Sequence, residues 1–229
     1  MILSEFITRL REDFLEDTIE PYFWSDDTLI RYANDAEKEA CIRAHLLIDS
    51  STDSVCVLNV TAGTSSYQLN GKVISILSAY NETLNYPIYQ LPKVSVDSML
   101  PNWRSLESEA PKYFIIDEVH STTTLTIIPK PTIDFSVRFT VNRLPLVNKS
   151  ITDSFEIPEI YHNDLLYWAA FLALSKQDVD TNKRDEARRY EDKFEQMFGK
   201  RKSAYTEVNN IRNSRLQSIR PASRKAGFR

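Results

Sequence analysis

The sequence predicts an α+β fold in which helices at both ends of the body flank a region of strands. Apolar residues recur every three or four positions before residue 50 and again after residue 158, whereas between these regions the period changes to two. The net charge at the end of the chain is opposite in sign to that of the rest. The last thirty residues hold nine of the 28 Lys and Arg but one of the 32 Asp and Glu, which leaves +8 there and −12 on residues 1–199.

Two helices are expected before the strands. The first covers residues 3–16, where one apolar stripe contains Leu3, Phe6, Ile7, Leu10 and Phe14. The second begins after Ser25, a helix-capping residue type, and acidic residues follow in its first turn. Its inner face is predicted to contain Leu29, Ile30, Ala33, Ala36, Ala40, Cys41, Ala44 and Leu47. The opposite side is predicted to contain Arg31, Asp35, Glu37, Lys38, Glu39 and Arg43.

The middle of the chain predicts strands because β-branched and aromatic residues alternate with polar ones. The expected strands cover residues 55–60, 66–69, 73–77, 86–91, 113–116, 123–128 and 133–141. Asn70 and Gly71 form a hairpin turn signal, and Pro129 and Pro131 are expected to separate two strands. Residues 95–106 contain a helical patch, which we expect to form a short helix over one sheet.

Two further helices are expected after the strands. Pro158 suits the first position of one helix, whose buried surface would contain Ile160, Leu165, Trp168, Ala169, Leu172 and Ala173. Asp180 or Thr181 would cap the other helix, and Gly199 would end it. Its apolar stripe contains Ala187, Tyr190, Phe194, Met197 and Phe198.

Counting the faces that need burial predicts how these elements assemble. Four amphipathic helices would pack as an antiparallel four-helix bundle with an inserted β-sandwich or barrel-like domain and an extended C-terminal arm. The alternative is a bundle with a looser mixed sheet on its side. The predicted parts are residues 1–50 and 153–199 for the two halves of the bundle, 51–152 for the β domain and 200–229 for the basic arm.

The motifs of common catalytic and cofactor sites are missing from the sequence. Its four glycines are isolated, which argues against phosphate-binding loops, and His45, His120 and His162 lack metal-ligand spacing. We therefore expect no enzyme activity, cofactor or metal site. Cys41 and Cys56 are expected to be buried apolar residues of a protein from a reducing compartment. The apolar run 165–174 is too short to span a bilayer, and His162 with Asp164 is interpreted as part of a solvated first turn.

The basic arm, residues 200–229, has the most specific composition in the chain. Its charge suits either phosphates or an acidic protein surface, and it also suits a disordered solubilising tail. A protein groove is favoured because apolar side chains lie among the cations, at Ile211, Leu216, Ile219 and Phe228.

Three sets of segments form a combined pattern. The first is residues 24–27 (Trp-Ser-Asp-Asp), 29–36 and 39–43, the second is residues 100–103, 110–113, 128–131 and 141–145, and the third is residues 157–162 with Trp168 and Ala169. In this order they resemble the opening helices, the β insertion and the returning helix of the head-to-tail adaptor, or connector, proteins of short-tailed bacteriophages. The resemblance covers about residues 3–200.

The resemblance implies a structural virion protein that forms a ring, of twelve copies, between the portal and the tail nozzle. Genomic DNA would pass through the lumen without specific binding, and the protein would be found in the host cytoplasm during assembly. Combining this with the charge pattern, we expect Arg212, Arg215, Arg220, Arg224 and Lys225 to bind the portal protein. Two alternatives remain: a tail accessory protein with peptidoglycan hydrolase activity, and a DNA-binding assembly factor.

Overall fold

The computed structural model describes residues 1–119, 122–175 and 181–203 and confirms an α+β fold. The chain divides into two compact units. The helical unit contains Met1–Val57, Asn70–Leu77 and Arg138–Arg201, and the strand unit contains Leu58–Leu69 and Ser78–Val137. The domain limits expected from the sequence stay a prediction.

The first helix forms where the sequence predicts it. It consists of α1 (Leu3–Arg9), which continues into a π-helical segment, η1 (Leu10–Leu15). The stripe residues Leu3, Phe6 and Leu10 are fully buried. The helix ends because Glu16 adopts a left-handed conformation, with φ of 54°.

The second helix, α2 (Asp26–Ala44), begins after Ser25, whose side chain accepts a hydrogen bond from the backbone of Thr28. The predicted inner face is confirmed, since Leu29, Ala33, Ala36, Ala40 and Cys41 are fully buried. The predicted polar face is wrong at three positions. Glu37 and Glu39 are buried, and only 3% of the Arg43 side chain is exposed. These charges lie inside because other segments of the chain provide partners for them.

The last helices differ from the prediction at their ends. Pro158 precedes only a single 3-10 turn, η2 (Glu159–Tyr161), and the α-helix α5 (Leu165–Leu174) begins later. The following helix, α6 (Thr181–Phe198), ends at Gly199 as predicted, with φ of 83°. Asp180, the other candidate cap, lies outside the described residues. Ile160 and Met197 were expected to be buried but are 76% and 52% exposed.

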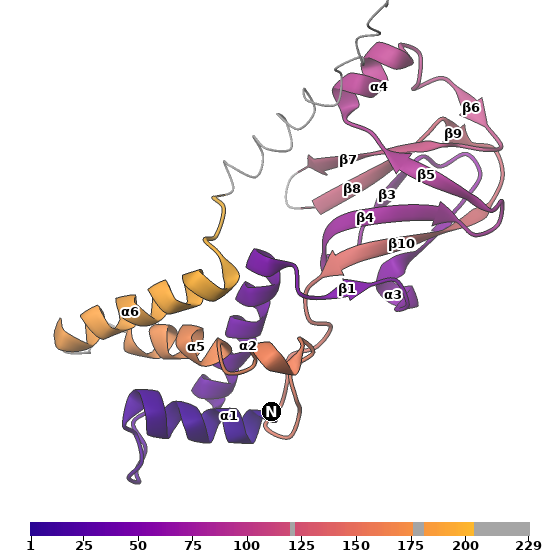
Figure 1. The fold of residues 1–229 in the computed structure, drawn as a ribbon. Helices are drawn as coiled ribbons and strands as arrows, with labels where there is room; N and C mark the ends of the chain where they lie inside the picture. The colour runs from indigo at the N-terminus through magenta and orange to yellow at the C-terminus, as the bar shows by residue number, and fades with distance from the viewer. Residues whose placement is uncertain (120–121, 176–180, 204–229) are drawn as a thin grey trace, which may run out of the picture. The chain divides into compact units, whose positions relative to one another are not determined.

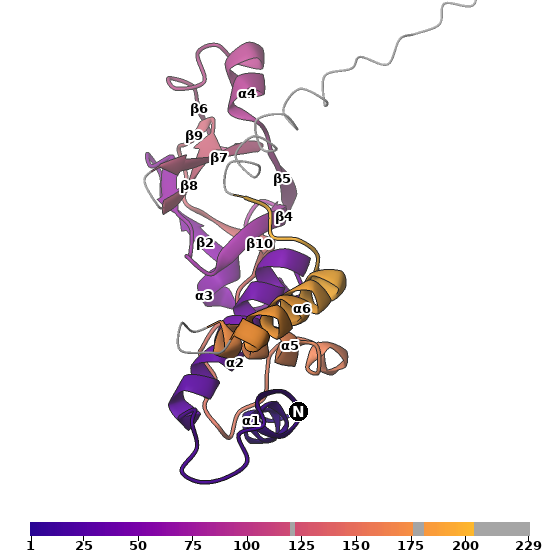
Figure 2. The same ribbon diagram turned by 90° about the vertical axis from the view of Figure 1, so that its left-hand side faces the viewer.

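These helices share one hydrophobic core, in which α5 contacts α2, α6 and η1. Figures 1 and 2 show α5 and α6 side by side, with α2 against α5. Small residues make the close approach of α2 and α5 possible, since Ala33, Ala40, Ala169 and Ala173 are all fully buried. The antiparallel four-helix bundle is not confirmed. Several helices are short, and α5 is apolar on all sides because it has neighbours on several sides.

Eight strands form one sheet in the order β1-β10-β4-β5-β7-β8-β3, with β2 paired to β10. Its strands are β1 (Ile48–Asp49), β2 (Val57–Val60), β3 (Ser66–Gln68), β4 (Val73–Asn81), β5 (Tyr86–Gln90), β7 (Tyr113–Val119), β8 (Thr122–Ile128) and β10 (Phe135–Arg143). β5 and β7 are parallel, whereas β7 and β8 are antiparallel with Tyr113 opposite Ile128. The strand region between the helices is thus confirmed. Within the described ranges its main sheet is curled like half a barrel, which agrees with the barrel-like form of the prediction and not with the two facing sheets of a sandwich.

Two local predictions in the strand region are wrong, and a third is incomplete. Val55 belongs to a short helix, α3 (Asp53–Cys56), that precedes β2. Asn70 and Gly71 make a turn but not a hairpin, because β3 pairs with β8 and β4 pairs with β5 and β10. Pro129 and Pro131 do separate β8 from β10, as predicted, but Lys130 and Pro131 also form a short strand, β9, that pairs in parallel with β6 (Glu107–Ser108).

The predicted short helix is α4 (Lys93–Met99). Val96 is fully buried against Ile115 of β7 and Ile128 of β8, so α4 covers part of one face of the sheet, as expected. The indole of Trp103 donates a hydrogen bond to Asp97 (2.7 Å) and ties the following turn to α4. Among the described residues, no helix combines the length and the hydropathy that crossing a bilayer requires.

Candidate functional site

The five residues predicted to bind the portal protein, Arg212, Arg215, Arg220, Arg224 and Lys225, lie outside the described residues. The described chain includes the start of the basic arm, residues 199–203, which we call the arm root. Its contacts show how the arm leaves the helical unit.

The arm root is attached to α2 through hydrogen bonds and ion pairs. After Gly199 ends α6, its carbonyl oxygen accepts a hydrogen bond from Nη1 of Arg43 (3.1 Å). Arg201 donates to Oε2 of Glu39 (3.0 Å), and Arg43 donates to Oε1 of the same carboxylate (2.8 Å). Glu39 therefore joins the arm root to the middle of the helical unit.

The Arg43 side chain is fixed by aromatic rings as well as by ions. Its guanidinium lies 4.6 Å from the ring centre of Trp168 and 5.1 Å from that of Phe194. Arg43 and Glu39 are 3% and 7% exposed, and removing one partner of such a buried pair costs about 3–5 kcal/mol. The buried contacts of Arg43 and Glu39 therefore fix the direction in which the chain leaves α6.

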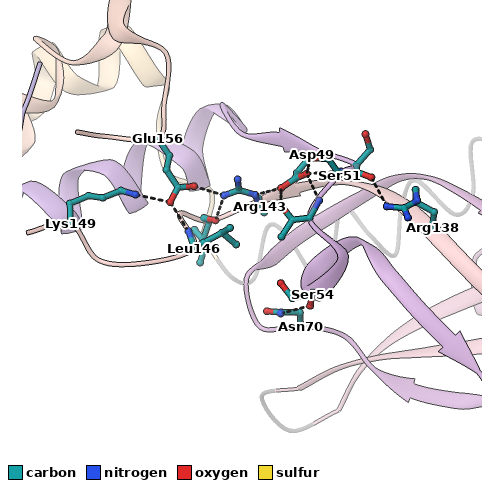
Figure 3. A network of polar contacts seen from close by, with 12 residues as sticks. Asp49, Ser51, Ser54, Asn70, Arg138, Arg143, Leu146, Lys149 and Glu156 are labelled. Carbon is teal, nitrogen blue, oxygen red and sulfur yellow. Dashed lines mark hydrogen bonds and ion pairs between the residues drawn. The ribbon is translucent and has the colours of Figure 1, made fainter. Parts of the chain in front are cut away.

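A second cluster of charges holds the segment that returns from β10 toward α5 (Figure 3). The Glu156 carboxylate accepts hydrogen bonds from Arg143 (2.6 Å), Lys149 (2.8 Å) and the backbone of Leu146 (3.0 Å). Arg143 also donates to Asp49 (2.7 Å), whose carboxylate receives further bonds from residues 51 and 52. We call this set, with its centre at Arg143, the Arg143 junction.

The Arg143 junction shifts the pKa values of both its acids downward. Burial alone would raise the pKa of Asp49, but hydrogen bonds from Thr52, Ser51 and Arg143 outweigh it and hold that pKa well below its usual range. Burial likewise opposes ionisation of Glu156, and the bonds from Lys149 and Arg143 again lower its pKa. Both acids are therefore ionised partners of Arg143 at neutral pH.

Glu37 lies next to this junction but in a different environment. Its Oε1 accepts hydrogen bonds from the backbone nitrogens of Glu156 (2.5 Å) and Ile157 (3.3 Å). Its Oε2 is buried without a hydrogen-bond partner. Burial raises the pKa of Glu37 despite the two backbone bonds. The neighbouring thiol of Cys41 is also buried, and burial raises its pKa to about 12, which confirms that this cysteine is an apolar residue rather than a reactive one.

The prediction of a solvated turn at His162 is wrong. His162 is 4% exposed, and its Nε2 lies 2.9 Å from the carbonyl oxygen of Ile157. Its Nδ1 lies 3.2 Å from the backbone nitrogen of Met1, which also donates to Glu159 (3.1 Å). Burial lowers the pKa of His162. The contact joins residues 161 positions apart, and no local spacing could have indicated it.

Some of the missed residues did carry a sequence signal. Glu37 follows Ala33 and precedes Cys41 by one helical turn each, which places it within the apolar stripe of α2. Glu39 and Arg43 have the spacing of an ion pair along a helix. No group of three metal-ligating side chains occurs within residues 1–119, 122–175 and 181–203. The charged groups described above hold chain segments to one another.

The charged groups described above are buried contacts that fix where chain segments leave the helical core. The sequence matches the SU10 adaptor protein family over residues 1–220. The chain therefore belongs to this family of phage adaptor proteins, and the resemblance to phage head-to-tail adaptors is confirmed. Membership makes it a structural protein of a bacteriophage and implies portal and tail proteins as partners. No individual curated protein matches the sequence.

Proposed function

We propose that copies of this chain form a ring of twelve between the portal and the tail nozzle of a short-tailed phage. The ring would complete the head and let DNA pass during ejection. Membership of the adaptor family is the observation that carries this proposal. In the proposed ring, residues 1–50 and 153–199 build the ring wall, 51–152 face the tail components and 200–229 attach to the portal. The protein would assemble in the host cytoplasm and remain in the virion.

The charge distribution supports these proposed roles for the body and the arm. Residues 1–199 carry −12, which repels DNA phosphates, so the genome would pass through the lumen without specific binding. The basic arm carries +8 and would be drawn to an acidic surface of the portal protein. The family match extends to Arg220, so it includes most of the arm.

The arm root supports portal attachment by the arm. Because Arg201 and the carbonyl of Gly199 are bonded to α2, the arm begins at a fixed place on the helical unit. A fixed starting point reduces the ordering cost when the following residues bind a partner. Arg212, Arg215, Arg220, Arg224 and Lys225 would then pair with portal carboxylates.

Mixing the purified chain with purified portal rings and imaging the product by electron microscopy tests this proposal. We expect the full chain to decorate the portal as a ring, and a chain that lacks residues 203–229 to lose that binding. A chain with a scrambled order of residues 203–229 has the same charge and is the matched control. Undiminished portal binding by the truncated chain would reject the role of the arm, and a full chain that never binds the portal would reject the adaptor ring.

A further inference from the structure

The loop between η1 and α2, residues 16–25, is held by a buried ion pair. Arg11 pairs with Asp17, and the side chains of both are 8% exposed. Arg11 also donates to the carbonyl oxygen of Trp24 (2.6 Å) and to Asp26 (2.7 Å). The Asp17 carboxylate accepts hydrogen bonds from the backbone of Phe23 (2.8 Å) and of Trp24 (3.1 Å). The Arg11–Asp17 ion pair thus binds both ends of the loop.

This fixed loop exposes apolar side chains. Ile19 is 82% exposed, Phe23 is 72% exposed and Tyr22 is 43% exposed. The guanidinium of Arg11 lies 4.1 Å from the ring centre of Tyr22, and the Phe23 ring meets Trp24 edge to face. An apolar tip on a prearranged loop loses little conformational freedom when it binds, as the anchor residues of protein interfaces do. We call Ile19, Tyr22 and Phe23 the loop tip.

The surroundings of the loop tip are strongly acidic. Residues 12–30 contain seven Asp or Glu and no Lys or Arg. Arg11 neutralises the buried Asp17 and pairs with Asp26, while Glu16, Glu20 and Asp27 are exposed. A partner for this loop must therefore combine an apolar contact with positive charge around it.

One face of α6 on the same helical unit has these properties. Arg189, Lys193 and Met197 follow each other at spacings of four residues and are all exposed, so they share one side of α6 near its end. Met197 is the apolar member and is 52% exposed. Lys193 lies 5.1 Å from the ring centre of Tyr167. We call this set the α6 basic face.

We propose that the loop tip of one chain docks on the α6 basic face of a second copy. A closed ring requires such a head-to-tail contact between two different surfaces of one chain. The inference therefore rests on the proposed ring and specifies the surfaces that build it. Phe23 and Ile19 pack against Met197 of the neighbouring copy, while Glu16 and Glu20 face its Arg189 and Lys193.

Cysteine cross-linking between two singly substituted chains tests this contact. Phe23→Cys protein is mixed with Met197→Cys protein under mild oxidation, both as concentrated free chains and bound to portal rings. Cys41 and Cys56 are buried, so they do not compete. The expected product is a covalent dimer formed at least tenfold more in the mixture than in either protein alone. Val147→Cys is the matched control, because residue 147 is 62% exposed but lies outside both surfaces.

The outcomes separate this inference from the proposed function. No cross-link above the Val147→Cys control, on portal rings that carry the chain, would overturn the docking contact and leave the adaptor role intact. Cross-linking of Phe23→Cys to itself would also overturn it, since that requires a symmetric contact. As a second measurement, Glu20→Lys should reduce the cross-link severalfold, and Arg189→Glu on the partner chain should restore it.

Discussion

Glu37 is a fully buried carboxylate with one oxygen unpaired, and burial raises its pKa. A raised pKa in the folded state stabilises the protein below the unfolded-state pKa, and this contribution is lost as the pH rises through the folded-state value. The side chain of the Glu37→Gln variant stays neutral, so we expect this variant not to lose stability through ionisation at residue 37 as the pH rises. Its free energy of unfolding relative to the wild type should increase as the pH rises above the unfolded-state pKa of Glu, about 4.3, measured by urea unfolding at several pH values.

The exposed substitution Glu12→Gln controls for the loss of one negative charge. The free energy of unfolding of Glu12→Gln relative to the wild type should show no comparable increase over the same pH range. A constant difference between Glu37→Gln and the wild type would contradict the assignment of a raised pKa to Glu37.

Arg143 joins two acids whose pKa values are lowered in the folded state. Arg143→Met leaves Asp49 and Glu156 without this partner and should cost about 3–5 kcal/mol of unfolding free energy at pH 7. In the wild type, the stabilisation by these acids is present above their unfolded pKa values, about 4, and is lost as the pH falls through the folded values. The variant should therefore lose less stability than the wild type on acidification.

Lys130→Met is the matched control for Arg143→Met. Lys130 pairs with Glu107 at 3.2 Å, but the two side chains are 38% and 57% exposed. An exposed pair contributes about 0–1 kcal/mol, so this variant should unfold nearly as the wild type does. Equal costs for the two variants in urea unfolding would show that the Arg143 junction is not a buried network.

At the scale of secondary-structure elements, the sequence predicted the helices and strands that have a clear period. The stripe Leu3, Phe6 and Leu10 and the cap Ser25 are local signals, and both are confirmed. The start of α5 was misplaced because that helix is apolar on all sides and has no stripe to locate its ends. The pairing of β3 with β8 was missed because strand pairing depends on residues far apart in the sequence.

Gly199 ends α6 with φ of 83°, a conformation that side chains disfavour. A Cβ atom at this position would meet nothing within 4 Å, so the cost of Gly199→Ala comes from the backbone alone. We expect a loss of about 1 kcal/mol in thermal or urea unfolding. Gly71→Ala is the control, since its site is equally open and its φ is not positive. A neutral Gly199→Ala would mean that α6 can end without the left-handed residue.

At the scale of the whole molecule, charge separation distinguishes an adaptor from a DNA-binding assembly factor. Residues 203–229 contain six Lys or Arg and one acid, so removing them changes the net charge from −4 to −9. We expect weak duplex binding by the full chain at low salt that falls about 1,000-fold between 50 and 200 mM salt. The truncated chain should not bind. Fluorescence anisotropy with a labelled duplex measures both, and binding that persists at 200 mM would favour the DNA-binding alternative.

The family and the charge distribution could be predicted from the sequence, because both depend on residue order alone. The buried charge and hydrogen-bond partners in the candidate site could not be predicted from the sequence. Glu39 receives Arg201 from 162 positions away, and Glu37 receives the backbone of Glu156 from 119 positions away. Such contacts depend on how helices far apart in the chain pack, and one sequence contains no direct record of that packing.

The carboxylate shared by Arg43 and Arg201 has a mechanical consequence. Tension applied to the arm would reach α2 as well as the last turn of α6, because Arg201 and the carbonyl oxygen of Gly199 are both bonded to α2. Pulling would then have to break these bonds before the end of α6 could unravel. In the proposed ring, this attachment would let the arm hold a partner without a covalent bond.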